Sequence, residues 1–221
     1  MNYYQGGFTM ENNTHSLQLK TDTLSRILDI ATEEFQKNGF QKASLREIVK
    51  KAGVTTGAFY GYYKSKEELF EALVGDTADT MLAFFEKEEK DFENLPEEEQ
   101  LKRMGVPTDS YIEKVCQYAF ENRKALKLIL TAGAGTRYED FIHQLTEREE
   151  RSTHKFIEVL SKHGYNVQPL NPYVEHVLYS GMYTSFFELI VHDVPTDEAM
   201  KCARSIVDFY TAGWMSIFGS R

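Results

Sequence analysis

Apolar residues recur every three or four positions along most of the chain, which is the period of a helix with one buried face. The first stripe begins after Asp22 and ends at Asn38-Gly39, with Phe40 as the apolar contact beyond it. Its members are Leu24, Ile27, Leu28, Ala31 and Phe35. Residues 1–20 lack this period, so we expect a mobile tail there, in which Met10 is a second candidate start. Strand alternation is absent, and the pattern predicts an all-α fold.

The next stretch, from Ser44 to Phe59, predicts two short helices joined by a tight turn. Leu45, Ile48, Val49 and Ala52 form one apolar stripe. Ser44 and Glu47 have the spacing of a capping box, in which each side chain accepts the backbone N–H of the other residue. Gly53 supplies the left-handed closing residue that a helix end favours. Thr55 then caps a second helix around Phe59. This order predicts a helix-turn-helix.

The second short helix is a weak helix former, which indicates that its outer face is selected for contact. Gly57 and Gly61 each cost about 1 kcal/mol relative to alanine. Gly57 also lets another backbone approach closely. The hydroxyls available for phosphate oxygens belong to Thr55, Thr56, Tyr60 and Tyr62. The alternative is that the tyrosines, Tyr63 included, only cover the hydrophobic seam.

A third helix begins after Ser65, which forms a second capping-box pair with Glu68. Lys66 is then the first helical residue, where a cation meets the positive end of the helix dipole. A phosphate would reverse this unfavourable effect, because free N–H groups and the ammonium would converge on it. The alternative is a solvated lysine.

The run AGVTTGAFYGYYKSKEELF resembles the DNA-binding segment of the TetR family of bacterial transcriptional regulators, and the similarity covers Leu24 to Leu73. The resemblance implies phosphate contacts from Ser44, Tyr60, Tyr62 and Lys66. It implies base-edge or close-approach roles for Arg46, Thr55, Thr56 and Gly57. Two residues depart from the family pattern: Thr56 replaces a frequent lysine, and Gly61 replaces an aromatic residue or histidine. Both departures shorten the reach towards the bases.

Everything after Leu69 is predicted to be helical, with breaks at Pro96 and at Gly105-Val-Pro107. Further stripes cover Tyr111–Leu130, Tyr138–His163, Pro172–His192 and Thr196–Phe218. We therefore expect a tail over residues 1–20, a helix-turn-helix DNA-binding domain over 21–68, and a helical effector-binding and dimerisation domain over 69–221.

The last two predicted helices are apolar on more than one face. One face can serve the core, so the other needs a partner. We expect a homodimer formed by these helices, in agreement with the family resemblance. Two reading helices would then meet successive major grooves about 34–36 Å apart on a near-palindromic site. The alternative is a helix pair buried within one subunit.

The net charge of −9 changes meaning when the chain is divided. The segment from Lys42 to Lys66 contains six basic residues and one acidic residue, Glu47. Its net charge is therefore +5, and that of the remainder is −14. Local clustering of basic charge makes a nucleic-acid footprint. The acidic remainder would repel DNA, so we expect docking through the basic segment alone.

Composition narrows the class of protein. The chain is 42% apolar and 27% charged, which is ordinary for a soluble protein. No apolar run approaches the roughly 18–20 residues that span a bilayer, and no secretion signal opens the chain. Cys116 and Cys202 fit no metal or redox spacing. We expect a cytoplasmic protein without membrane association, metal or cofactor.

Aromatic residues with polar tips predict a mostly apolar ligand pocket. The candidates are Tyr111, Tyr118, Phe141, Tyr179 and Tyr183; simple core packing is the alternative for each. The resulting hypothesis is a regulator, most simply a repressor, that binds double-stranded DNA and is released by a small effector of aromatic or apolar character.

Two other classes of protein are alternatives, an enzyme or carrier and an RNA-binding protein. An enzyme or carrier with an incidental basic segment would need a nucleophile–base pair, a metal motif or a phosphate loop, and we find none. An RNA-binding helix-turn-helix would need stacking platforms for single-stranded bases. We therefore predict no catalytic residues.

Overall fold

The computed structural model describes residues 10–218, with side chains from Leu19 onward. This part of the chain contains helices and no strand, which confirms the predicted all-α fold. The helices are α1 (Met10–Lys42), α2 (Leu45–Lys51), α3 (Thr56–Tyr60), α4 (Lys66–Glu93), α5 (Glu97–Arg103), α6 (Asp109–Glu121), α7 (Arg123–Ala132), α8 (Phe141–Lys162), α9 (Pro172–Val191) and α10 (Thr196–Phe218). No helix among these residues combines the length and apolar character needed to cross a bilayer.

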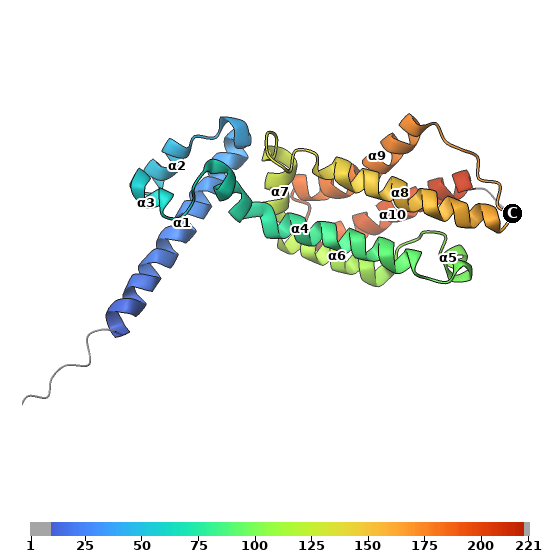
Figure 1. Cartoon of the computed structure of the whole chain (residues 1–221), viewed down its shortest axis with the longest axis horizontal. Helices are drawn as coiled ribbons and strands as arrows, with labels where there is room; N and C mark the ends of the chain where they lie inside the picture. The colour runs from blue at the N-terminus through green and yellow to red at the C-terminus, as the bar shows by residue number, and fades with distance from the viewer. Residues whose placement is uncertain (1–9, 219–221) are drawn as a thin grey trace, which may run out of the picture.

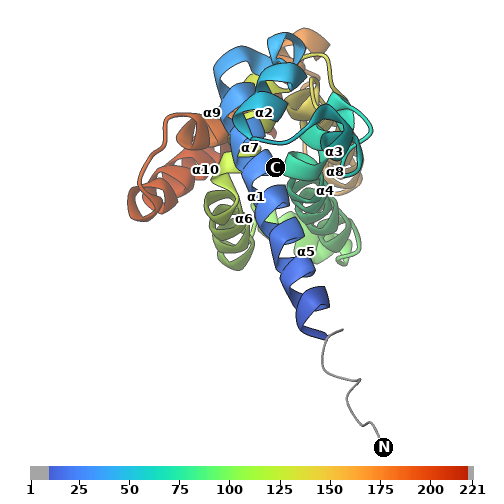
Figure 2. The ribbon, with the colours of Figure 1, turned by 90° about the vertical axis from the view of Figure 1, so that its left-hand side faces the viewer.

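The molecule is elongated, with α1–α3 at one end and α5–α10 at the other (Figure 1). We call residues 10–68 the head and residues 69–218 the body. Helix α4 begins in the head and continues along the body. Viewed from the head end, α1 crosses in front of the body helices and projects beyond them (Figure 2).

Helix α1 starts earlier than the apolar stripe predicts. Its backbone is helical from Met10, so the predicted tail is corrected from that residue onward, while residues 1–9 lie outside the described part. Adding turns to an existing helix costs far less than nucleating one, so polar residues can continue it without an apolar stripe. At the other end the helix kinks at Gly39 (φ 69°, ψ 163°) before the last turn to Lys42.

The head core joins all of its helices. Ile27 and Phe35 of α1, Ile48 of α2 and Phe59 of α3 are completely buried. Phe70 of α4 packs edge-on against Phe35, with ring centroids 5.0 Å apart. The buried cluster continues without interruption into the body. A head of this size is marginal alone, and this continuity supplies the support that it needs.

The body follows the predicted order with one clear difference. The stripe predicted over Tyr111–Leu130 is two helices, α6 and α7, separated at Asn122. Asn122 leaves the helical conformation and its side-chain amide donates to the Tyr118 carbonyl oxygen at 3.0 Å. Side chains of this kind compete with the helix for backbone partners. The last two helices agree with the prediction within one residue.

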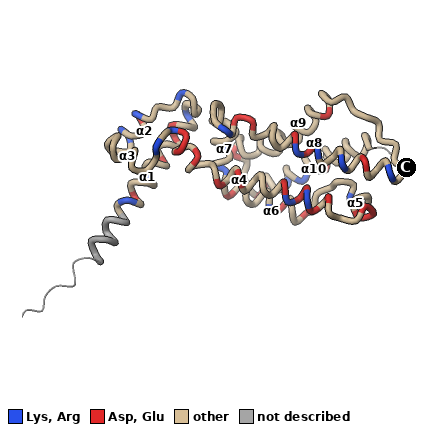
Figure 3. The backbone as a smooth tube through the Cα atoms, in the orientation of Figure 1, with Lys and Arg blue, Asp and Glu red and all other residues tan. Residues whose placement is uncertain are grey.

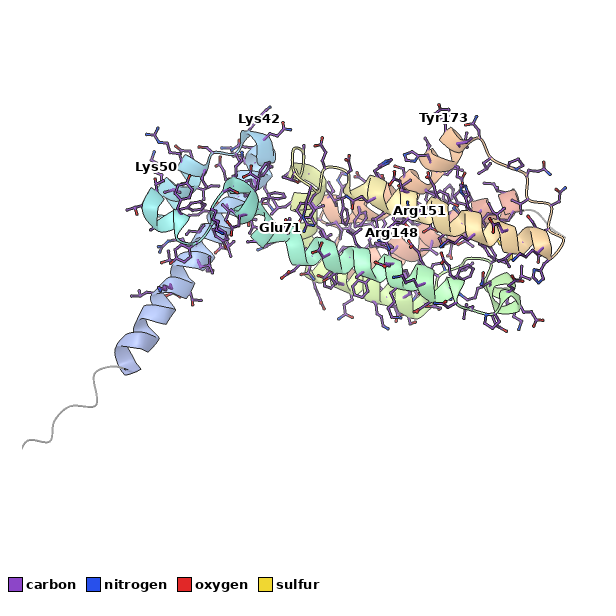
Figure 4. The ribbon with its side chains drawn as sticks, in the orientation of Figure 1. Lys42, Lys50, Glu71, Arg148, Arg151 and Tyr173 are labelled. Carbon is purple, nitrogen blue, oxygen red and sulfur yellow. The ribbon has the colours of Figure 1, made fainter. Side chains whose placement is uncertain are left out.

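A polar junction holds the α7–α8 turn against the start of α4 (Figure 4). The Arg137 guanidinium donates to Glu71 Oε1 at 2.5 Å, and the Tyr138 hydroxyl donates to Glu71 Oε2 at 2.6 Å. The hydrogen bond from Arg137 is the main reason that the pKa of Glu71 is lowered. The junction therefore fixes the helix that leaves the head to the adjoining part of the body.

Candidate nucleic-acid interface and ligand cavity

The turn between α2 and α3 is built from backbone hydrogen bonds. The Val54 N–H donates to the Val49 carbonyl and the Gly53 N–H to the Lys50 carbonyl, both at 3.2 Å. Gly53 has φ +64°, as the predicted closing residue requires. This pair of bonds is a Schellman motif. It sets the direction in which the chain enters α3.

Both predicted capping boxes form only by half. The side chains of Ser44 and Ser65 accept N–H groups from Glu47 and Glu68, at 3.3 and 3.2 Å. The reciprocal bonds are absent from the described contacts of these glutamates. Glu68 accepts from the Lys64 N–H instead. The Ser44 N–H is taken by Glu34 of α1, which the local sequence could not indicate.

Glu34 connects α1 to α2. Its carboxylate accepts from the Ser44 N–H at 3.1 Å and from the Asn38 side chain at 2.8 Å, and it lies 3.4 Å from the Lys51 ammonium. Only 5% of Glu34 is exposed. The Ser44 N–H is the largest cause of the lowered pKa of this carboxyl group, ahead of Asn38 and Lys51. Glu34 thereby orients the helix that precedes the turn.

Helix α3 divides its residues between anchor and surface. Phe59 is fully buried, and Tyr63 packs on it with ring centroids 5.9 Å apart. Tyr63 thus takes the seam-covering role. Tyr60, in contrast, is 52% exposed, and Tyr62 is half-buried. Thr55, Thr56 and Gly57, at the start of α3, are exposed as well. Thr55 also caps the helix, because its hydroxyl accepts from the Ala58 N–H at 3.1 Å.

Exposed basic residues surround this surface. Lys42, Arg46, Lys50 and Lys64 are exposed, while Ser44 is half-buried in its capping role. Figure 3 shows the basic positions along α2 and at the end of α1. The side chains of Lys42 and Lys50 extend away from the fold (Figure 4). The sequence-predicted residues of the head therefore lie on or beside α2 and α3, and Lys66 at the start of α4 reaches the backbone just before Ser44.

The ammonium of Lys66 lies on the end of α1. It donates to the carbonyl oxygens of Phe40 at 2.8 Å and of Gln41 and Ala43 at 3.3 Å. It also lies 4.6 Å from the centroid of the Phe40 ring. An ammonium has three donors, and these carbonyls match that number. The geometry favours a positioning role for Lys66, and the phosphate contact implied by the resemblance stays a prediction.

A cavity of about 220 Å³ lies inside the body, between α4, α6, α8, α9 and α10. Three of the five predicted ligand residues line it: Tyr111, Tyr179 and Tyr183. Tyr118 lies outside, packed on Phe84 with centroids 5.3 Å apart. It follows Tyr111 by two helical turns, which is about 10 Å along the axis. Phe141, at the beginning of α8, also lies outside and packs on Phe187.

Charged residues that the sequence analysis did not single out also line the cavity: Glu88, Glu89, Arg103 and Glu149. The sequence does carry a signal for two of these residues, Glu88 and Glu89. Glu88 lies three residues after Phe85 and four before Phe92, and Glu89 lies four after Phe85 and three before Phe92. Helical spacing therefore puts both acids on the same face of the helix as these two phenylalanines.

Burial dominates the electrostatics of the cavity. It is the largest cause of the raised pKa of Glu149, and the neighbouring carboxylate of Glu89 raises it further. The Tyr183 hydroxyl, which donates to Glu149 Oε2 at 2.8 Å, acts in the opposite direction. Burial also raises the pKa of Glu89 and of the Tyr179 phenol. The lining is therefore acidic and aromatic, and its burial disfavours the charged forms of these groups.

A third surface consists of large apolar side chains on the last two helices. Its members are Tyr173, Val174, Val177, Phe209 and Met215, each more than 40% exposed. Tyr173, the most exposed at 84%, projects away from the body (Figure 4). Large exposed apolar side chains of this kind are candidates for an interaction surface.

A helix-turn-helix head on a helical body with an internal cavity defines a class of DNA-binding regulators. Residues 27–73, which run from α1 into α4, match the family described as bacterial regulatory proteins, tetR family. The match covers the head and confirms the resemblance of this region to the TetR family.

Curated relatives share the head. The chain is 46% identical over 55 residues to the uncharacterized HTH-type transcriptional regulator YdgC of Bacillus subtilis, covering 25% of this chain and 28% of that protein. It is 38% identical over 63 residues to UidR of Escherichia coli, covering 28% and 32%. With the A-factor receptor protein of Streptomyces griseus it shares 31% over 115 residues, covering 52% and 34%. The matches thus span about a third of these relatives. YdgC and UidR are both described as HTH-type transcriptional regulators.

Solved structures share the overall architecture. The TetR-family regulator PfmR from Thermus thermophilus has a TM-score of 0.52 and 19% identity, covering 86% of this chain and 99% of that one. SCO3833 from Streptomyces coelicolor has a TM-score of 0.53 and 15% identity, covering 85% and 90%. These similarities confirm the fold, with a helix-turn-helix head followed by a helical domain.

Proposed function

We propose that the protein is a ligand-responsive transcriptional repressor that binds a near-palindromic DNA operator as a homodimer and leaves it when an effector binds. The observation that carries this proposal is the surface of α3. Phe59 anchors the helix while Thr56, Gly57 and Tyr60 stay exposed. The Tyr60 ring contacts Phe59 edge-on at 5.6 Å but keeps about half of its surface exposed, and the neighbouring basic residues are exposed as well.

The proposed contacts follow from reach and charge. Tyr60, Tyr62 and the residues at the start of α2 would hold phosphates. Arg46 and the first residues of α3 would approach base edges, since an α-helix fits the major groove. The segment from Lys42 to Lys66 carries +5 while the remainder carries −14. Long-range attraction would therefore bring the head, rather than the body, to the DNA.

The apolar surface of α9 and α10 supports the homodimer. A two-fold interface uses the same patch on both subunits, and these helices expose large apolar residues that the subunit itself does not cover. Each dimer would carry two heads, as a near-palindromic operator requires. We place such a regulator in the cytoplasm, where its DNA would be accessible.

Helix α4 supports the coupling between effector and DNA. Phe85 and Phe92 line the cavity, and the same helix begins at Lys66 beside the end of α1. An effector that moves α4 would change the separation of the two heads. Effector and DNA would then oppose each other by one coupling free energy, commonly about 1–3 kcal/mol.

The test begins with selection of genomic fragments that the purified protein retains, followed by sequencing. The recovered operator is then titrated by fluorescence anisotropy with and without a saturating effector. We expect lower operator affinity with the effector. Equal affinities would remove the regulatory claim, and a monomer that ignores every duplex at low salt would remove the whole proposal.

A further inference from the structure

The cavity has aromatic walls and little room. Tyr179 stacks on Trp214 with centroids 4.3 Å apart and planes 18° from parallel, and Phe218 also stacks on Trp214 with centroids 5.9 Å apart. Phe85 meets Tyr183 edge-on at 5.4 Å. The volume, about 220 Å³, lies below the roughly 300–1,000 Å³ of most ligand sites. The occupant must therefore be compact and mostly apolar.

The only basic side chain in the described lining is already in use. Arg103 donates to Glu88 Oε1 at 2.6 Å and to the Val106 carbonyl at 3.1 and 3.3 Å. Its guanidinium also lies over the Phe92 ring, 5.3 Å from the centroid. An incoming anion would have to displace these partners. Arg103 therefore neutralises Glu88 and leaves two other carboxylates in the lining.

Of these two carboxylates, Glu89 lies near a cation, the Arg148 guanidinium. Arg148, labelled in Figure 4, approaches Glu89 Oε1 with its Nε at 3.6 Å and Glu86 with an Nη2 at 3.4 Å. Glu149 differs, because no ion pair reaches it within the described residues. Its recorded hydrogen bond is the one from Tyr183 to Oε2. Glu149 is thus the uncompensated acid of the cavity.

The hydroxyl of Tyr179 is a second unsatisfied group. Tyr179 lines the cavity and is 2% exposed, and its oxygen makes no hydrogen bond of good geometry in the described part of the chain, although the Thr153 side chain lies close enough to lower the pKa of the phenol. It precedes Tyr183 by one helical turn on α9. A buried polar group without a partner costs about 1–3 kcal/mol. A ligand with N–H donors would supply the partners that this phenol and Glu149 lack.

We propose that the effector is an amphipathic organic cation, in which a compact aromatic or apolar body carries a protonated amine. The ammonium donates to Glu149, while the aromatic residues of the lining surround the body and attract the positive charge. This inference rests on the proposed function, because it names the ligand class of the same cavity. Carboxylate and phosphate ligands are disfavoured, since they would meet Glu149 and Glu89.

The test uses three probes with the same apolar body: 4-phenylbutylamine, 4-phenylbutan-1-ol and 4-phenylbutanoate. Binding to the full-length protein is measured by calorimetry, with the fluorescence of Trp214 as a second readout. Trp214 is the single tryptophan of the chain and lines the cavity. We expect the amine to bind at least about tenfold more tightly than the alcohol, since a charge pair is strong in a site of low dielectric constant. We expect the carboxylate to bind most weakly.

Two variants on α8 localise the effect. Glu149→Gln removes the charge and keeps the shape, so we expect about a tenfold loss of amine affinity with the alcohol unchanged. Glu147→Gln is the matched control. That side chain is 51% exposed and faces His143 on the surface. We expect all three probes to bind this control as they bind the parent protein.

Several results would overturn the inference. Equal binding of amine and alcohol would do so, as would preferred binding of the carboxylate or failure of all three probes at millimolar concentration. An unchanged amine affinity in Glu149→Gln would also count against it. Because these titrations contain no DNA, their failure leaves operator binding intact. Loss of operator binding in the parent protein would instead remove the proposed function and leave the probe result standing.

Discussion

The head and the body each enclose a glutamate, and they surround it differently. Glu34 in the head receives a backbone N–H, a side-chain amide and a nearby ammonium. Glu149 in the body receives one phenol and faces another carboxylate. The pKa of Glu34 is lowered, mainly by the Ser44 N–H, whereas burial raises the pKa of Glu149. The charged form of Glu34 therefore stabilises the folded head, whereas the charged form of Glu149 lowers the stability of the folded body.

This difference separates a region built to hold one geometry from a region built to accept something. In the head, the described polar groups around the turn find partners within the fold. In the body, the Tyr179 hydroxyl and Glu89 Oε1 are buried in the cavity lining without a hydrogen bond, and Glu149 has no ion pair among the described residues. Unsatisfied groups of this kind cluster at functional sites because folding alone does not favour them.

The largest effect is expected from the anchor of α3. Phe59→Ala should lower the free energy of unfolding by about 3–5 kcal/mol, because it empties a fully buried site. Urea denaturation measures the loss. Tyr60→Ala is the control on the same helix: it should leave stability within about 0.5 kcal/mol and weaken DNA binding. Equal destabilisation by both variants would contradict the division of α3 into anchor and surface.

The next effect comes from Glu34. Glu34→Ala should cost about 1.5–3 kcal/mol, the range for hydrogen bonds to a charged group. Since folding lowers the pKa of this carboxyl group, its contribution is present above the unfolded pKa and is lost as pH falls through the folded value. Denaturation midpoints of parent and variant should therefore converge in acid. A gap that widens in acid would show that the carboxylate does not stabilise the head.

Lys66 should give a smaller loss. Lys66→Met removes a cation from the carbonyl end of α1, for which we expect about 1–2 kcal/mol of destabilisation. The salt dependence of operator binding provides a separate readout. A slope lower by about one unit would establish a phosphate contact in addition. An unchanged slope would leave the α1 carbonyls as the functional partners, and unchanged stability would contradict the positioning role.

The smallest effect is a gain. Glu149→Gln should raise stability at neutral pH by about 1 kcal/mol, because it removes a poorly compensated buried charge. For a chain of this length, that corresponds to a rise of about 2–4 °C in Tm. Folding raises the pKa of Glu149, so its favourable contribution exists below the unfolded pKa and disappears as pH rises through the folded value. The advantage of the variant should shrink in acid. A less stable variant at neutral pH would reverse our interpretation of this acid.

The sequence predicted the head well where the signals are local. Gly53, the caps at Ser44 and Thr55, and the Phe59 anchor all depend on residues within a few positions of one another. The chemistry of a cap or a left-handed residue is the same in any fold, so spacing suffices to predict it. The partner of the Ser44 N–H was missed because Glu34 lies on another helix.

The cavity depended on contacts that spacing does not encode. Tyr111, Tyr179 and Tyr183 were predicted from their type, but Tyr118 and Phe141 have the same character and lie elsewhere. Whether an aromatic residue faces a cavity depends on where its helix crosses the others. Glu149 was missed for the same reason, because an acid on an amphipathic helix is ordinarily solvated.

The continuity of α4 has a mechanical consequence. Its 28 residues extend about 42 Å at 1.5 Å per residue, with the cavity near one end and the grip on α1 at the other. A tilt of about 5° at the cavity would carry the opposite end through about 4 Å if the helix stays straight. In a symmetric dimer the head end of α4 would move in both subunits. A small displacement at the cavity would therefore change the separation of the two heads along the DNA by several times as much.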